Sequence, residues 1–564
     1  MKSFRILMPL ILAAVPAVAR TPAAPTAMVS AADPRAAEAG RTMLRQGGNA
    51  MDAVAATLLA LTVVEPQSSG IGGGGLLVYQ ATGEKLPATF DGRETAPASA
   101  TGTLFTDAAG VPQPFREAVP GGRSVGVPGN LAMIRLAHAK YGKLPWATLF
   151  GPAISLARNG YDVSPRLARS IAGSRETLAR THDAAALFLH DDLTPKTVGE
   201  HIVNEPLART FEAIAAGRPD AFYRGATARA IMAAVTTAPT NPSAMTLADL
   251  AGYRAKQRAP VCGRYRAWRV CSMGPPSAGG IAVITILGQL QRFDLARLGP
   301  DNAVSWHLLG ESERLAFADR AAFGGDQDFV TVPVAGLTDP AYIKARGALI
   351  AADRTMARAE PGHPAGAAPR GAPATHEVPS TTDVAIADRA GNVASLTSTV
   401  EGPFGSSLVA GGFILNNELT DFDFVPVVGG QPVANRVEGG KRPRSSMSPS
   451  IVYDAQGRVV MVVGAAGGPT IPAQTAKAII GVLDWKLSIQ DAIALPLAYA
   501  TDDVLILEKG PQGARLQALE PALKALGHKT ALYALPLKAN GIERVAGGWR
   551  GGADPRSEGV ALGL

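Results

Sequence analysis

The strongest constraint on the fold of this chain is a break in composition at residues 359–380, AEPGHPAGAAPRGAPATHEVPS. This stretch carries almost no large apolar side chain and many prolines and glycines, which predicts a disordered linker. Directly after it, apolar and polar residues alternate, a turn follows at 388–392, and a second apolar run begins. That pattern predicts a β-hairpin. The break therefore divides the chain between Ser380 and Thr381.

Composition indicates a folded protein with a sizeable core and little affinity for nucleic acid. The chain has 564 residues, 47% hydrophobic and 18% charged, with a formal net charge of +7. The densest basic cluster is KRPR at 441–444, and aromatic residues make up only 5%. A groove for nucleic acid needs a basic stripe with stacking aromatic residues, and this pattern does not supply one.

Residues 1–19, MKSFRILMPLILAAVPAVA, have the pattern of a secretory signal peptide. Two early cations precede an apolar run, and small residues lead to a cleavage site after Ala19. A membrane anchor is the alternative, but the apolar run is short and interrupted by proline. We therefore expect export to a periplasm or out of the cell, with a mature chain that begins at Arg20.

The two cysteines, Cys262 and Cys271, suit an oxidising compartment. The sequence VCGRYRAWRVC predicts a hairpin with its tip near Tyr265 and Arg266, which would set the two sulfurs opposite each other. A disulfide there would close a loop of about ten residues. The chain has no Cys-x-x-Cys and no histidine pair at ligand spacing, so we expect no metal site.

Helical periodicity and capping residues occur mainly before the break, and the part after it is rich in strand patterns. Helices are predicted at 34–46, 49–64, 130–141, 301–323, 339–352 and 473–484.

Two glycine motifs resemble catalytic or phosphate-binding sequences but lie in the wrong context. Residues 122–126, GRSVG, match the nucleophile elbow, which requires a strand before the serine and a helix after it. Prolines and glycines flank this motif, so a loop is predicted. Residues 70–75, GIGGGG, lead into a strand without a following Lys-Ser/Thr, which favours a tight turn with close backbone approach.

Thr381 is the candidate nucleophile. A threonine hydroxyl needs a base beside it, and the α-amino group of a chain that begins with threonine can supply one. Such a threonine is exposed by cleavage, and the preceding linker offers an accessible bond at Ser380. An ordinary threonine at a strand edge is the alternative that the local pattern alone allows.

Several further segments narrow this choice, because together they closely resemble the gamma-glutamyltransferase family, whose members hydrolyse glutathione with an N-terminal nucleophile. The resemblance covers nearly the whole mature chain in the family's order. Its segments are AAEAGRTMLRQGGNAMDAVAA, EPQSSGIGGGG, DGRETAP, SVGVPG, MGPPSAGG, TTDVAIADRAGNVASLTSTVEGPFGSSLVAGGFILNNELTDF, GGKRPRSSMSPSIV and GAAGGPTIPAQT.

The resemblance implies catalytic roles for four residues. Thr381 corresponds to the family nucleophile, which first cuts the chain after Ser380 and then attacks the substrate amide. Thr399 corresponds to the threonine that orients it. Gly467 and Gly468 correspond to the pair whose backbone N–H groups stabilise the oxyanion, where glycine leaves room for the tetrahedral group.

The resemblance also implies a receptor for a zwitterion. Its arginine, which grips the α-carboxylate with a fork that lysine cannot copy, corresponds to Arg93. Two serines share that carboxylate, and two acidic residues accept from the α-ammonium. In this sequence these are Ser445 and Ser446, and Glu418 and Asp421.

Three departures from the family pattern bear on the pocket. Glu401 stands where the best-known members have asparagine on the ammonium side, so it could add one negative charge to the receptor. Asp383 replaces a histidine found in some members. The segment 422–444 contains no tyrosine, whereas in some members a tyrosine there belongs to a lid.

The resemblance implies an α/β fold, a four-layer αββα N-terminal-nucleophile sandwich made as one precursor. We expect a signal peptide at 1–19, a large subunit at 20–380 that ends in the linker 359–380, and a small catalytic subunit at 381–564. The two subunits should stay together as a heterodimer, because neither is expected to hold a complete sheet core.

The expected activity is transfer of the γ-glutamyl group of glutathione or related amides to water, amino acids or peptides through an acyl-threonine. No cofactor is implied, and no stable membrane anchor is expected. One alternative is a glutaryl- or cephalosporin-type acylase of the same superfamily. Another is an uncleaved periplasmic protein that binds zwitterions without catalysis.

Overall fold

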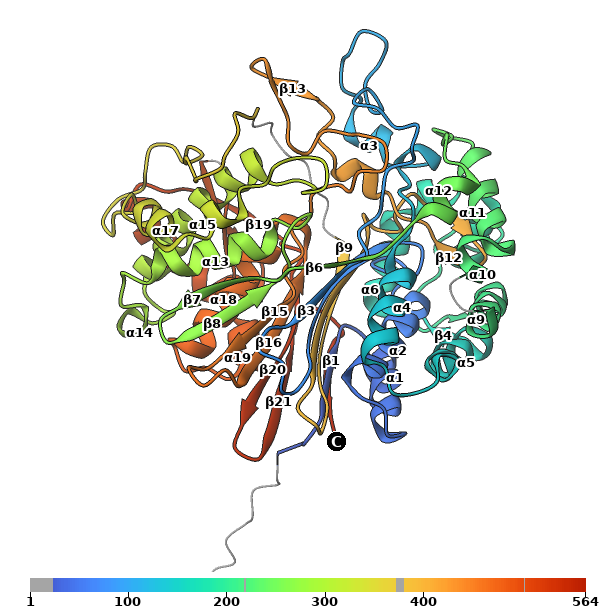
Figure 1. The fold of residues 1–564 in the computed structure, drawn as a ribbon, viewed down its shortest axis with the longest axis horizontal. Coiled ribbons are helices and arrows are strands. Elements are labelled where there is room, and N and C mark those ends of the chain that lie inside the picture. Colours follow the sequence, from blue (N-terminus) through green and yellow to red (C-terminus); the bar gives the residue numbers. More distant parts are fainter. Residues whose placement is uncertain (1–23, 218–219, 372–379, 502) are drawn as a thin grey trace, which may run out of the picture.

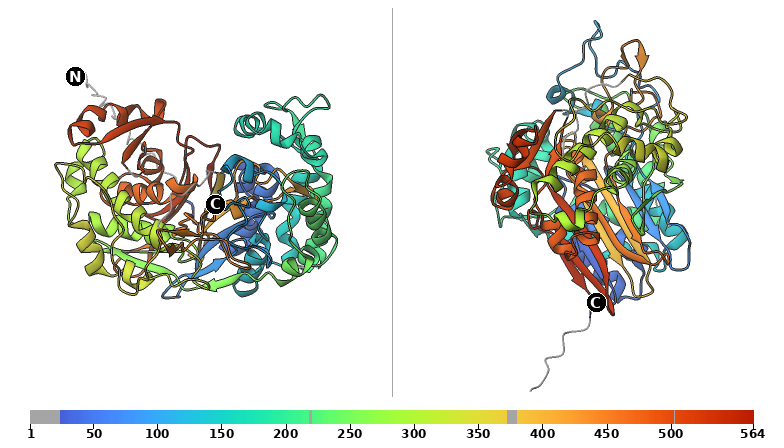
Figure 2. Two further views of the ribbon diagram at one scale, coloured as in Figure 1. Left: turned by 90° about the horizontal axis from the view of Figure 1, so that it is seen from above. Right: turned by 90° about the vertical axis from the view of Figure 1, so that its left-hand side faces the viewer.

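Two β-sheets pack face to face and helices cover the outer face of each, which gives four layers (Figures 1 and 2). The computed structural model describes residues 24–217, 220–371, 380–501 and 503–564. The predicted signal peptide, 1–19, lies outside these residues. Within them, no helix combines the length and the apolar character needed to cross a membrane.

The first sheet has seven strands and is built from both sides of the predicted break. All of its pairings are antiparallel, and β9 lies in its interior between β1 and β10. In order across the sheet the strands are β22 (Val560–Gly563), β1 (Met28–Ala31), β9 (Ser380–Ala387), β10 (Val393–Glu401), β2 (Gly74–Gln80), β3 (Ala88–Asp91) and β6 (Lys256–Arg258). The β9–β10 pair is the hairpin that the sequence predicts.

The second sheet has six strands and is likewise shared between the two parts of the chain. In order these are β21 (Gly548–Ala553), β20 (Lys538–Val545), β16 (Val459–Ala466), β15 (Ser450–Tyr453), β8 (Trp268–Ser272) and β7 (Val261–Tyr265). Strands β16 and β20 pack against β9 of the first sheet, so one face of β9 is turned toward the second sheet.

The helical layer over the first sheet centres on α2 (Ala50–Val64), every residue of which is buried. Asn49 and Asp52 form a capping box at its start, as the predicted boundary requires. The remaining helices of this part are α1 (Pro34–Arg45), α3 (Phe115–Ala118), α4 (Asn130–Tyr141), α5 (Gly151–Asn159), α6 (Pro165–Gly173), α7 (Arg175–Leu178), α8 (His182–Phe188), α9 (Glu205–Gly217), α10 (Asp220–Tyr223), α11 (Ala226–Thr236) and α12 (Leu247–Gly252).

Helices α13 (Gly279–Leu290) and α18 (Ile471–Leu483) pack on the second sheet, and the long helix α15 (Ala303–Phe323) packs on α13. The helix predicted at 339–352 is shorter, because α17 (Pro340–Gly347) ends before residues 348–352. The other helices here are α14 (Leu295–Leu298), α16 (Val334–Leu337), α19 (Ile489–Ala494), α20 (Ala514–Gln517) and α21 (Glu520–Ala525).

Short strands complete the structure. They form the pairs β4 (Tyr161–Asp162) with β5 (His201–Ile202), β11 (Val409–Ala410) with β12 (Phe413–Ile414), and β13 (Val427–Val428) with β14 (Gln431–Pro432), and the three-stranded sheet β17 (Ala498–Ala500), β18 (Val504–Glu508) and β19 (Lys529–Tyr533).

The predicted disorder of the linker 359–380 is wrong for its first part. Residues 359–371 have no helix, but their backbone is attached to the body of the protein. Arg346 donates to the carbonyl of Glu360 at 2.7 Å, and the N–H of Gly362 donates to Asp319 at 2.7 Å. Backbone hydrogen bonds thus hold a segment that has no large apolar side chain to bury. Residues 372–379 lie outside the described part.

The hairpin β7–β8 carries the disulfide between Cys262 and Cys271, which are direct partners across the two strands. Strand β7 lies at the edge of the second sheet, so β8 is its only neighbour within that sheet. A covalent link opposite the tip of the hairpin therefore secures an edge strand.

We expect the double variant Cys262→Ser, Cys271→Ser to lose about 2–3 kcal/mol of unfolding free energy, because the unfolded chain regains the entropy of a loop of about ten residues. Urea unfolding of the oxidised wild type, the reduced wild type and the variant measures this change. The reduced wild type is the matched control and should behave like the variant. Equal midpoints for all three proteins would show that the hairpin does not depend on the bond.

Candidate active site

Thr381 is the second residue of β9 and lies directly opposite Thr399 of β10. Its hydroxyl donates to the Thr399 hydroxyl, with the two oxygens 3.4 Å apart. Thr381 is buried, with 5% of its surface exposed, and it lines a cavity. The side chain is therefore held between the sheets and still reaches an open space.

The Thr399 hydroxyl has two further contacts, one of them to the predicted cleavage site. It donates to the carbonyl oxygen of Ser380 at 2.8 Å and accepts the backbone N–H of Glu401 at 2.8 Å. The pairing of β9 and β10 shifts register between Thr399 and Glu401, where Glu401 has φ = 76°. This irregularity turns the Glu401 N–H back toward the threonine.

Gly467 and Gly468 lie where β16 ends and the chain turns into α18. Their φ angles are 129° and 58°, in the region that favours glycine. A Cβ atom at Gly467 would lie 2.7 Å from the hydroxyl of Thr470. Gly468 lines the same cavity as Thr381 and begins the turn that leads into α18, whose N-terminal end favours negative charge.

The cavity brings most of the predicted site residues together. Met447 and Ile471 complete its wall, and Gly467 lies next to the lining residue Gly468. The predicted residues that line it are Arg93, Thr381, Thr399, Glu401, Glu418, Asp421, Ser445, Ser446 and Gly468.

The charged part of the cavity is arranged differently from the simple receptor that the sequence predicts. The guanidinium of Arg93 is paired directly with Glu418 and Asp421, the two acids expected to face the substrate ammonium. It also donates to the carbonyls of Pro443 at 3.2 Å and Arg444 at 2.8 Å. Arginine and acids thus form one continuous network.

The two serines are held by the turn that precedes α13. Ser277 donates to the carbonyl of Met447 at 2.6 Å, and the N–H of Ala278 donates to the carbonyl of Ser445 at 3.0 Å. The hydroxyl oxygen of Ser445 accepts the N–H of Met447 at 3.1 Å. The segment MGPPSAGG, before the break, thereby positions serines that come after it.

Comparison with known proteins agrees with this arrangement. The family model described as gamma-glutamyltranspeptidase matches residues 36–564. The chain belongs to the gamma-glutamyltranspeptidase family. It is 35% identical over 549 residues to a glutathione hydrolase proenzyme of Bacillus subtilis strain 168, covering 95% of this chain and 91% of the relative.

The chain is also similar to acylases. The chain is 35% identical over 527 residues to the acylase ACY 1 proenzyme of Pseudomonas sp. strain SE83, covering 92% of this chain and 89% of the relative. The crystal structure of a cephalosporin acylase from Bacillus halodurans superposes with a TM-score of 0.84 at 26% identity, covering 98% and 99% of the two chains. The predicted N-terminal-nucleophile fold is confirmed.

The residues that depart from the pattern of this gamma-glutamyltranspeptidase family have defined surroundings. Glu401 lines the cavity and accepts from the side-chain amide of Asn417, which also accepts the N–H of Gly402 at 2.8 Å. Asp383 is buried between the sheets and accepts the Thr397 hydroxyl at 2.8 Å. The segment without tyrosine contains the short hairpin β13–β14 (Figure 1).

The two glycine motifs have structural roles. Ser124 donates to the carbonyls of Val119 at 2.6 Å and Gly121 at 3.1 Å, so its hydroxyl closes a turn. A Cβ atom at Gly72 or Gly73 would lie 2.0 Å from a backbone oxygen. The predictions of a loop at the first motif and of close backbone approach at the second are confirmed.

The structure adds Glu94, which sequence reasoning missed although it follows Arg93 in DGRETAP. Glu94 is completely buried, and Gly74 and Gly126 make room for its side chain. A Cβ atom would lie 2.2 Å from that side chain at Gly74 and 2.7 Å from it at Gly126. Burial raises the pKa of Glu94 to about 8, against the opposing effect of Arg93. Burial likewise raises the pKa of Glu418 to about 8.

Glu94→Gln should therefore make stability depend less on pH. A carboxyl group whose pKa rises from 4.5 to about 8 on folding holds its proton in the folded chain after the unfolded chain has lost it. Stability then falls as pH rises through that interval. We expect the wild-type Tm to fall more steeply between pH 5 and pH 8 than the Tm of Glu94→Gln.

The measurement is thermal unfolding at several pH values within that interval. Glu212→Gln is the matched control, because its carboxylate is 46% exposed on α9, and its curve should follow the wild type. Parallel curves for Glu94→Gln and the wild type would contradict the burial of a protonated Glu94.

Proposed function

We propose that this protein is a self-cleaving γ-glutamyltransferase and glutathione hydrolase whose nucleophile is Thr381. The observation that carries the proposal is the contact of the Thr399 hydroxyl with both the Thr381 hydroxyl and the Ser380 carbonyl, at a cavity that Thr381 and Thr399 share with an arginine–carboxylate network. Membership of the gamma-glutamyltranspeptidase family and similarity to glutathione hydrolase proenzymes support it.

Cleavage begins with attack of the Thr381 hydroxyl on the carbonyl carbon of Ser380. The C–O bond forms, the C–N bond breaks, and the proton passes from the hydroxyl to the released α-amino group. The Thr399 hydroxyl, 2.8 Å from the Ser380 oxygen, stabilises the negative charge that develops there. Water then hydrolyses the ester, which leaves a carboxylate on Ser380 and a free amino group on Thr381.

The free amino group of Thr381, with a pKa of about 7.7–8.0 in unstrained peptides, then serves as the base for the transfer reaction. The hydroxyl attacks the γ-carbonyl of the donor, and the backbone N–H groups of Gly467 and Gly468 receive the oxyanion. The amine product leaves with a proton, and water or an amino acid resolves the acyl ester. These steps use side chains, backbone and water alone.

Donor binding exchanges partners within the charged network. The guanidinium of Arg93 has five N–H groups and contacts four acceptors in this structure. Asp421 lies at the cavity side of the network with 10% of its side chain exposed. The donor carboxylate takes a place on Arg93 and the serines, and Asp421 turns to the donor ammonium.

Acylase activity is the second candidate, because an acylase proenzyme is 35% identical to this chain. Three carboxylates, those of Glu401, Glu418 and Asp421, line the cavity and favour a donor with an ammonium group. A glutaryl donor offers these acids no ammonium group. The charge of the cavity therefore favours γ-glutamyl donors.

The precursor is proposed to enter the export pathway through residues 1–19 and to act in a periplasm or outside the cell. Its two subunits, 20–380 and 381–564, stay together because the strands of each complete both sheets. Separation would expose β9 and β10 along their length.

Thr381→Ala should remain full length because it has no attacking hydroxyl. The wild type should give two chains of roughly 37 and 19 kDa, from a mass of 58.1 kDa over 564 residues, and the smaller should begin Thr-Thr-Asp-Val. Denaturing electrophoresis and N-terminal sequencing measure this.

Two matched variants act as controls. Thr381→Ser keeps a hydroxyl and should still be cut. Thr382→Ala removes the neighbouring hydroxyl, which donates to Glu65 at 2.8 Å, and should also be cut. Processing of Thr381→Ala at the same bond would refute the assignment of the nucleophile.

The wild type should prefer γ-glutamyl-p-nitroanilide over glutaryl-p-nitroanilide by at least about 10²-fold in kcat/KM, because sites built around a polar group reject analogues that lack it. The ratio should be measured with and without glycylglycine as acceptor. Glu401→Asn, the family's residue at that position, is the companion variant and should lower the preference if Glu401 faces the ammonium. Equal or faster turnover of the glutaryl donor would assign acylase activity instead.

A further inference from the structure

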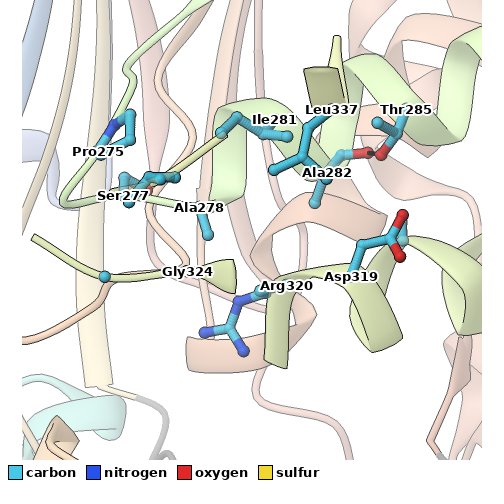
Figure 3. Close-up of a pocket in the computed structure, with 13 residues that line it drawn as sticks. Pro275, Ser277, Ala278, Ile281, Ala282, Thr285, Asp319, Arg320, Gly324 and Leu337 are labelled. Atoms are coloured by element: carbon cyan, nitrogen blue, oxygen red, sulfur yellow. Dashed lines mark hydrogen bonds between the residues drawn. The ribbon is translucent and has the colours of Figure 1, made fainter. Parts of the chain in front are cut away.

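A second, narrow cavity lies directly behind the two serines and is lined in part by residues of α15. Figure 3 shows that Ser277 and Ala278 form one end of it and that Asp319 and Arg320 of α15 enter it from the other side. Ser277 and Ala278 are the residues that hold the backbone of Ser445 and Met447. The cavity and the serine pair thus share a wall.

Arg320 reaches through this wall to the substrate cavity. It lies in the last turn of α15, where its carbonyl accepts the N–H of Gly324 at 2.9 Å, and only 7% of its surface is exposed. Its guanidinium donates to the hydroxyl oxygen of Ser446 at 2.7 Å. Ser446 in turn lines the cavity that contains Thr381.

Asp319, the neighbouring acid, is engaged elsewhere. It accepts the Tyr342 hydroxyl at 2.8 Å and the N–H of Gly362 at 2.7 Å, and it lies 3.3 Å from Arg346. Figure 3 shows the guanidinium of Arg320 turned away from the Asp319 carboxylate. The guanidinium of Arg320 instead donates to Ser446.

This contact fixes the polarity of the Ser446 hydroxyl. An arginine only donates, so the serine oxygen acts as acceptor toward Arg320, and it is through its O–H bond that the serine can bind an acceptor such as a carboxylate. Donation from a cation also polarises that O–H bond and makes it a stronger donor. Ser445 is held in the same sense by the N–H of Met447.

A second arginine lies on the serine side of the cavity. Arg93, the arginine expected to bind the donor carboxylate, is already paired with the carboxylates of Glu418 and Asp421. The guanidinium of Arg320, buried behind Ser446, donates to the other side of the carboxylate subsite.

We propose that Arg320 is a positioning residue that holds Ser446 as a hydrogen-bond donor to the α-carboxylate of the donor substrate. The inference rests on the proposed γ-glutamyl transfer and deepens it, because it assigns part of the carboxylate recognition to a residue outside the substrate cavity.

The test compares two donors that differ only in the α-carboxylate, γ-glutamyl-p-nitroanilide and 4-aminobutyryl-p-nitroanilide. Arg320→Met, which keeps the length of the chain without its donors, should raise KM for the γ-glutamyl donor about tenfold or more, with kcat within about threefold. For the donor without the carboxylate, kcat/KM should change less than about twofold. In a Ser446→Ala background, Arg320→Met should have little further effect.

Arg346→Met is the matched control, because Arg346 is a buried arginine that pairs with Asp319 and not with a serine. Any effect it has should be equal on the two donors. Arg320→Lys retains a cation, and its KM for the γ-glutamyl donor should fall between those of the wild type and Arg320→Met. If Arg320→Met is not processed into two chains, Arg320→Lys is used in its place.

The inference is overturned if the Arg320 variants lose kcat/KM equally on both donors, or if their KM for the γ-glutamyl donor is normal. In that case γ-glutamyl transfer by the wild type still supports the proposed function. If the wild type shows no γ-glutamyl transfer, both the inference and the proposed function are refuted.

Discussion

The pairing of β9 with β10 is the interaction on which the rest of the site depends. It sets Thr381 opposite Thr399 and brings the Thr399 hydroxyl to the Ser380 carbonyl. Successive side chains on a strand point to opposite faces, so a slip of one residue would turn Thr381 away from the cavity. Because β9 also pairs with β1 on its other edge, its register is fixed from both sides.

The second constraint is electrostatic. Arg93, Glu94 and Glu418 are buried together, and Asp421 closes the network at the cavity. Three carboxylates around one guanidinium cannot all remain charged at low cost in a buried place. The raised pKa values of Glu94 and Glu418 mean that protons supply the balance in the absence of a ligand. A bound ammonium would take over that role, so recognition of the donor is linked to the protonation of the site.

The features that could be predicted from sequence are local or carried by motifs. The hairpin after the break, the disulfide hairpin and the helix of Ala50–Val64 follow from alternation and capping within short segments. The family motifs also predicted that residues from both halves of the chain share one site, and most of these residues line one cavity. Their spacing in the sequence alone would not have predicted this.

Contacts between distant segments were not predictable in the same way. The pairing of Arg93 with Glu418 joins residues 325 positions apart, and the sequence suggested separate partners for them. The contact of Arg320 with Ser446 spans 126 positions. The attachment of residues 359–371 depends on donation from Arg346 of α17 and on acceptance by Asp319. Neither contact can be predicted from composition.

The shared sheets explain why the proposed cut before Thr381 would be compatible with an intact site. In the first sheet β9 pairs with β1, which precedes the cut, and with β10, which follows it, so the ladders on both edges of β9 survive the loss of that one peptide bond. Before the cut, the Thr399 hydroxyl donates to the Ser380 carbonyl. In the proposed reaction this carbonyl departs, while the Glu401 N–H still holds the threonine oxygen in place. The hydroxyl that stabilises cleavage is then available to orient the newly formed amino group and the Thr381 hydroxyl, so one side chain serves both reactions in turn.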